Sequence, residues 1–103
     1  MSNSTSPSPL KAHLAHFLST RHPPKTFCPS EVARALFPSE LKDLGFSEWR
    51  EAMPAIRELV WELRGAGECE VLQKGSVLGM DVGLEDVRGP IRVRRVEGVQ
   101  AED

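Results

Sequence analysis

Apolar residues recur every three or four positions along three stretches of the chain, and this spacing predicts three helices. The first stretch covers residues 9–20, where Pro9 lies in the first turn and its missing N–H costs nothing. The second covers residues 28–37, where Pro29 fits the first helical position. The third and longest covers residues 47–67. Proline or glycine follows or ends each stretch, as is typical of helix ends.

The third stretch contains a proline inside its apolar pattern, which leaves two interpretations of the segment. Ser47 is a suitable N-cap, and the apolar face that follows consists of Trp49, Met53, Ile56, Val60 and Leu63. Pro54 either kinks one long helix, or residues 47–52 form a short turn and the main helix covers 54–65. The connector before it, residues 37–46, has spaced apolar residues and predicts one more short helical turn.

The remainder of the chain has the alternating pattern of β-strands. Residues 68–73 alternate, 76–78 form a short return after a turn, and 91–96 form a last strand. A loop over 79–90 separates the last two, and residues 26–27 could supply a further short strand. The order predicts an α+β fold of the winged helix-turn-helix type, with three helices followed by a small antiparallel β-hairpin or sheet.

Length and composition predict one domain with short tails. The chain has 103 residues, of which 40% are hydrophobic and 27% charged. We expect a disordered N-terminal tail over 1–8, a winged-helix-like domain over 9–96 and an acidic disordered tail over 97–103. No apolar run approaches the roughly 20 residues of a membrane span, and no signal peptide is evident. Two cysteines are too few for a disulfide scaffold, so we expect a cytoplasmic protein.

Charge is distributed unevenly along the chain, although the net charge is only −2. Residues 1–27 carry about +3, residues 67–87 about −4, residues 88–96 about +4 and residues 97–103 about −3. Local fields steer encounters with partners more than total charge does. The segment 88–96 is therefore a candidate contact for a polyanion.

On the third predicted helix, Arg50, Arg57 and Arg64 form one stripe beside the apolar face. Trp61 falls next to this stripe, close enough to stack on an arginine. The stripe could contact phosphates, or it could be an ordinary solvated helix face. Trp61, outside the main core stripe, indicates an interface with nucleic acid or with protein, or packing under the wing.

The predicted last strand belongs to the sequence RGPIRVRR, residues 88–95. Arg92 and Arg94 alternate with apolar residues, so they point away from the core. The preceding loop is acidic at Asp81, Glu85 and Asp86, and these side chains either oppose contact with phosphates or pair with the strand arginines. The candidate residues for nucleic-acid binding are Arg50, Arg57, Trp61, Arg64, Lys74, Arg88, Arg92 and Arg94.

The sequence contains no strong signal for a metal site or a catalytic centre. His13 and His16 could share an ion with His22 or a cysteine, but no pair has the close spacing of CxxC or HExxH. Cys28 at a helix start could be a reactive thiol or a small buried residue. No glycine-rich phosphate loop and no acid–base pair is evident. We therefore expect no enzyme activity, no cofactor and no metal.

Four ordered segments resemble a small family known as domain of unknown function 3253. They are TFCPSEVARAL (26–36), WREAMPAIRELVWELR (49–64), QKG (73–75) and RGPIRVRR (88–95). The resemblance implies a compact helical domain with a β-hairpin, similar to winged helices, and implies no activity. It also implies that Arg34, Arg57, Lys74 and residues 88–90 belong to one recurring pattern.

These observations favour a transcription-regulator-like module that binds nucleic acid, with double-stranded DNA as the expected partner and no catalytic activity. The alternative is a protein–protein interaction or homodimerisation module of the same fold, in which Trp61 and the uneven charges contact a protein surface. No membrane contact and no small-molecule substrate is expected.

Overall fold

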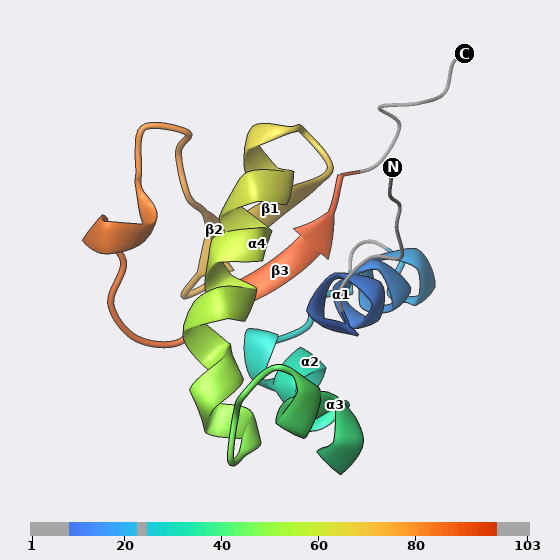
Figure 1. The fold of residues 1–103 in the computed structure, drawn as a ribbon. Helices are drawn as coiled ribbons and strands as arrows, with labels where there is room; N and C mark the ends of the chain where they lie inside the picture. The colour runs from blue at the N-terminus through green and yellow to red at the C-terminus, as the bar shows by residue number, and fades with distance from the viewer. Residues whose placement is uncertain (1–8, 23–24, 97–103) are drawn as a thin grey trace, which may run out of the picture.

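The computed structural model of the chain describes residues 9–22 and 25–96, and the tails expected at 1–8 and 97–103 lie outside these residues. Within them the chain is a mixed α+β protein with four α-helices and a three-stranded antiparallel sheet (Figure 1). The elements are α1 (Pro9–Thr20), α2 (Pro29–Arg34), α3 (Pro38–Asp43), the 3-10 helix η1 (Trp49–Ala52), α4 (Met53–Gly65), β1 (Cys69–Gln73), β2 (Ser76–Val77), the 3-10 helix η2 (Leu84–Asp86) and β3 (Arg92–Arg95).

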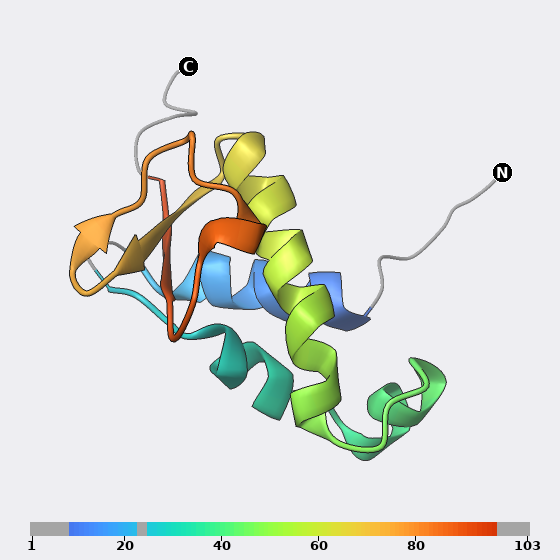
Figure 2. The same ribbon diagram turned by 90° about the vertical axis from the view of Figure 1, so that its left-hand side faces the viewer.

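The core lies between the inner face of the sheet and the helices α1, α2 and α4. The predicted apolar stripes supply it: Leu14 from α1, Val32 from α2, and Ile56 and Val60 from α4 are fully buried. Figure 1 shows α4 in front of the strands, and Figure 2 shows the hairpin of β1 and β2 to the left of α4. The sheet therefore has one covered face and one outer face, which is the usual arrangement for a small antiparallel sheet.

Two helices begin with the same sequence, Pro-Ser-Glu, and with the same hydrogen bond. The Cys28 N–H donates to Oε2 of Glu31 at 3.0 Å before α2, and the Phe37 N–H donates to Oε1 of Glu40 at 2.8 Å before α3. In each case a carboxylate satisfies a backbone donor at the helix start. The connector over 37–46 therefore forms a helix of its own, and the prediction of three helices is one short.

The proline in the longest apolar stretch marks a helix start, which confirms the second of the two interpretations. The short 3-10 helix η1 precedes α4, and Pro54 lies in the first turn of α4, where no N–H is required. Ser47 precedes η1 by two residues, and its backbone N–H donates to Oε1 of Glu51 at 2.9 Å. The expected cap by Ser47 on one continuous helix is therefore wrong.

The sheet has the strand order β2-β1-β3, with Val71 opposite Val93. The short strand expected at 26–27 is a single bridge, in which Phe27 pairs with Val93 through N–H···O=C bonds of 3.0 and 2.7 Å. Both side chains are fully buried. Ile91 and Val93 face the core as their alternation predicts. The bridge fixes the segment between α1 and α2 alongside β3.

We predict that part of the stability depends on the ionised helix-start carboxylates. Partial burial acts to raise the pKa of Glu31, but the Cys28 N–H and the Arg21 guanidinium outweigh it and lower the pKa below the ordinary 4.5. A lowered folded pKa stabilises the protein above the unfolded value, and this stabilisation is lost as pH falls through the folded value. The free energy of unfolding should exceed that of Glu31→Gln most clearly above about pH 5.

Urea unfolding between about pH 7 and pH 3 measures this difference, with the exposed Glu58→Gln as the matched control. The gap between the protein and Glu31→Gln should close at acid pH, while Glu58→Gln should remain close to the protein throughout. A gap that is independent of pH would show that charge on Glu31 does not stabilise α2.

Candidate functional site

One flank of α4 is covered by the long loop that connects β2 to β3. We call residues 79–89 of this loop the strap, which Figure 2 shows face on. Trp61 donates its indole N–H to the carbonyl of Val82 at 3.3 Å. Arg64 donates to the same carbonyl at 3.1 Å and to that of Gly79. The indole and the guanidinium therefore fix the strap on α4.

Arg64 is 5% exposed, although its position on the helix places it in the predicted arginine stripe. Its guanidinium lies 5.2 Å from the centre of the Trp61 ring, which confirms the expected stacking. No carboxylate forms an ion pair with Arg64 within residues 9–22 and 25–96. Backbone carbonyls are thus the partners of a buried cation, an arrangement that requires every donor to be well placed.

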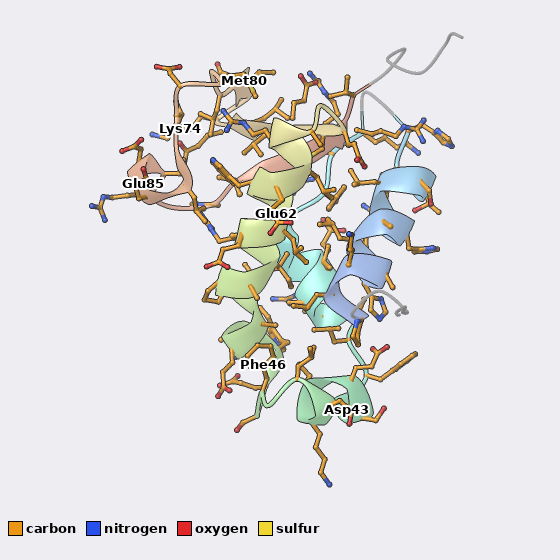
Figure 3. The ribbon with its side chains drawn as sticks, turned by 45° about the horizontal axis from the view of Figure 1, so that its top comes forward. Asp43, Phe46, Glu62, Lys74, Met80 and Glu85 are labelled. Atoms are coloured by element: carbon orange, nitrogen blue, oxygen red, sulfur yellow. The ribbon has the colours of Figure 1, made fainter. Side chains whose placement is uncertain are left out.

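The solvent face of α4 is acidic. Glu58 and Glu62 are exposed on it, one turn apart, and Figure 3 shows Glu62 on α4 between the strap and α1. Arg57 is half-buried at the flank, with Nη2 3.4 Å from the carbonyl oxygen of Gly89. In this arrangement α4 presents carboxylates to solvent, and its cations face the strap.

Arg92 and Arg94 of β3 bind neighbours on the outer face of the sheet, whereas Arg95 contacts Leu18 and His22. Nε of Arg92 donates to the Thr26 hydroxyl at 3.0 Å, and its Nη1 lies 2.9 Å from the Cys28 sulfur. Nε of Arg94 donates to Glu70, its cross-strand partner, at 2.6 Å. Arg92 and Arg94 therefore do not pair with the acidic loop, as one interpretation of the sequence had it, because that loop packs on α4.

The Phe27–Val93 bridge brings two further cations to this side of the molecule. Arg21 pairs with Glu31 at 3.1 Å, and the charge of Arg92 also helps to lower the pKa of Glu31. Lys25 is exposed next to Thr26. We call Arg21, Lys25, Arg92 and Arg94 the basic face.

Sequence reasoning did not include Arg21 or Lys25 in the candidate set. The available signals were the positive charge of residues 1–27 and the short strand expected at 26–27. Neither signal predicts that the segment at 26–27 pairs with β3, because strand pairing depends on the tertiary fold. The bridge between Phe27 and Val93 shows this pairing.

Two parts of the recurring pattern implied by the family resemblance, Arg57 and residues 88–90, lie together at the end of the sheet, whereas Arg34 lies beside Trp49. The side-chain amide of Gln73 donates to the carbonyls of Arg88 at 2.6 Å and Pro90 at 3.4 Å. Between them, Gly89 has φ +86°, a conformation that favours glycine. Its carbonyl faces Arg57 as described. Lys74 directly follows Gln73 and is exposed.

Arg50 lies apart from the other candidates, before the start of α4. Its guanidinium is 4.6 Å from the centre of the Trp49 ring and pairs with Glu48 at 3.1 Å. The exposed Arg34 lies 4.7 Å from the same ring. Arg34 and Arg50 therefore both lie against the Trp49 ring, and Arg50 does not join the basic face.

The histidines and cysteines do not form a metal site in the part of the chain that the structure describes. His13 instead pairs with Glu40 at 3.0 Å. Burial raises the pKa of the Cys69 thiol to about 12. Among the described residues, no helix is long and apolar enough to cross a membrane.

Comparison with known families identifies the chain. Residues 7–96 match the model of a family described as "Protein of unknown function (DUF3253)". The chain therefore belongs to this family, which confirms the resemblance of its four segments. A search of curated proteins returned no match.

We predict that Arg64 is the main polar anchor of the strap. Arg64→Met retains a buried apolar stem but leaves the carbonyls of Gly79 and Val82 without this donor, and it should destabilise the fold by about 2 kcal/mol. Trp61→Phe should cost about 1 kcal/mol, since Val82 keeps its bond from Arg64. The exposed Glu62→Gln is the control and should change stability by less than about 0.5 kcal/mol.

Chemical unfolding provides the stability values, and amide hydrogen exchange locates the change. Exchange in residues 79–87 should accelerate in Arg64→Met well beyond the rest of the chain. Equal stability of Arg64→Met and Glu62→Gln would contradict this role.

Proposed function

We propose that this member of the DUF3253 family binds nucleic acid through the phosphates, using the basic face, and carries out no catalysis. The observation that carries the proposal is the Phe27–Val93 bridge. It places the arginines of β3 beside the cationic segment between α1 and α2. Arg88 and Lys74 extend the positive charge toward the hairpin end.

The charges of the basic face favour a polyanion. The basic face carries four cations against two carboxylates, Glu31 and Glu70, whereas the solvent face of α4 and the strap expose carboxylates. Guanidinium groups bind phosphate through charge-assisted hydrogen bonds. The present partners of Arg92 are a hydroxyl, a carbonyl and a thiol. Phosphate oxygens are stronger acceptors than these neutral groups, so the exchange is favourable.

We further propose a winged-helix relationship. The order α1, bridge at Phe27, α2, α4, β1, β3 agrees with it, and so does the position of Phe27 next to β3 in the sheet. Two features differ from a winged helix of three helices and a hairpin. The elements α3 and η1 lie between α2 and α4, and the strap folds back on α4.

The proposed contacts also limit the kind of recognition. Phosphate contacts position a protein on a duplex but carry no direct sequence information. We therefore expect binding to double-stranded DNA with little sequence preference. Both cysteines are free thiols, which supports a cytoplasmic location, where thiols remain reduced.

We predict salt-dependent binding to a random-sequence duplex, measured by fluorescence anisotropy. Affinity should fall steeply between about 50 and about 200 mM salt, and each lost phosphate contact should reduce the slope by about one unit. Arg92→Gln and Arg94→Gln should each weaken binding about three- to tenfold. Arg50→Gln is the matched control because Arg50 lies away from the basic face, and it should bind as the unmodified protein does. Absent binding at 50 mM salt would contradict the proposal, as would equal losses in all three variants.

A second candidate function, self-association, is favoured by the free edge of the sheet. Val77 in the edge strand β2 is 49% exposed, and Met80 just beyond it is 69% exposed. An open edge with apolar neighbours can pair with the same edge of a second copy. This observation replaces Trp61 as the basis of the homodimer hypothesis, because the strap covers Trp61.

Light scattering at increasing protein concentration tests this second function. A dimer that dissociates in Val77→Lys and Met80→Lys, but persists in Phe37→Lys, would support it. Phe37 is the control because it is 64% exposed and lies outside the sheet. A monomer at every concentration would rule it out.

A further inference from the structure

We propose that the strap is a displaceable cover over a second phosphate-binding surface, formed by Arg57, Trp61 and Arg64, and that nucleic acid releases it. This inference rests on the proposed function, because the same ligand would occupy both surfaces. In the structure the strap is closed. When it opens, the flank of α4 becomes available to phosphates.

Three hydrogen-bond donors of α4 hold the strap. Arg57, Trp61 and Arg64 follow at intervals of four and three residues, so they lie on one flank of the helix. All three donate to the strap, and every acceptor is a backbone carbonyl. Phosphate oxygens form charge-assisted bonds with guanidinium groups that are about twice as strong as neutral ones. The exchange of carbonyls for phosphates is therefore favourable at both arginines.

Apart from the side-chain bonds of Arg57, Trp61, Arg64 and Gln73 to its carbonyls, the strap has little hold on the rest of the fold. Its backbone hydrogen bonds are local turns, such as the N–H of Val82 to the carbonyl of Gly79 and the N–H of Asp86 to that of Gly83. Its apolar side chains Leu84 and Val87 are only half-buried. An open groove of about 510 Å³ lies between these side chains and the start of α4. The strap can therefore leave α4 without breaking the sheet.

The charge of the strap is opposite to that of the α4 flank that it covers. In the closed state the strap holds Asp81, Glu85 and Asp86 exposed beside the α4 flank, where they repel phosphate. Release removes these carboxylates and uncovers two cations in the same step. The ligand thus binds the open state better than the closed one, which is the condition for shifting the equilibrium.

The α4 flank is close to the basic face along the chain. The strap ends at Gly89, whose carbonyl faces Arg57, and Pro90 and Ile91 lead from Gly89 into β3. Gly89 is therefore three residues from Arg92, the nearest arginine of the basic face. With the strap displaced, one duplex can contact both surfaces.

Amide hydrogen exchange of the unmodified protein, with and without a random-sequence duplex, tests the direction of the motion. On duplex binding, exchange in residues 79–87 should accelerate at least about threefold, which corresponds to a more populated open state. Exchange in β3 should slow in the same sample. Protection or unchanged exchange of residues 79–87 would overturn the strap proposal, and salt-dependent binding would still support the proposed function.

A strap variant provides the matching affinity test. Leu84→Ser with Val87→Ser weakens the closed state without altering a proposed contact residue, and it should bind the duplex about fivefold more tightly. Met80→Ser is the control, since Met80 is exposed on the same strap, and it should bind as the unmodified protein does. In the double variant, Arg57→Gln should reduce the salt slope by about one unit, because Arg57 then contacts phosphate.

The outcomes separate the two proposals. Equal affinity of the double variant and the Met80→Ser control would overturn the strap proposal alone. Absent binding in the unmodified protein and in the double variant would overturn both proposals. If only the double variant binds the duplex, the strap inhibits binding in the unmodified protein. The contact surface would then be the α4 flank and not the basic face.

Discussion

The pairing of Phe27 with Val93 determines how the rest of the molecule is arranged. It joins residues 66 positions apart through two backbone hydrogen bonds in a site without solvent. A buried N–H or carbonyl that loses its partner costs much more than an exposed one, so the pairing is strongly specified. It sets the position of α1 relative to β3 and, with it, the position of every cation on the outer side of the sheet.

Much of the fold could be predicted from local patterns, because the spacing of apolar residues indicates which face of a helix or strand is buried. The spacing of Ile56 and Val60 and the alternation of Ile91 and Val93 identify core faces without knowledge of the partner element. The connector that became α3 was expected only as a helical turn. Its Pro-Ser-Glu start, repeated from α2, was the signal that it forms a complete helix.

The candidate site was less predictable for a physical reason. A helix pattern distinguishes the core face of α4 from the other faces, but it does not reveal a distant loop that covers one of them. Arg64 was therefore expected in an exposed stripe, and packing under the wing was only one of the interpretations of Trp61. The strap, 15 to 21 residues away, buries Arg64 and covers Trp61. Arg21 and Lys25 were missed for the related reason that strand pairing is a property of the whole chain.

The side chains of α4 hold the strap through hydrogen bonds to its backbone carbonyls, and every amino acid has such a carbonyl. The side chains of Asp81, Glu85 and Asp86 are free of this task and point into solvent or back to their own turn. Substitutions at these three positions can consequently change the charge of the strap without weakening its attachment to α4. Relatives with the same fold can therefore carry straps of very different charge on α4. Such relatives would differ in the polyanions that bind to the helix.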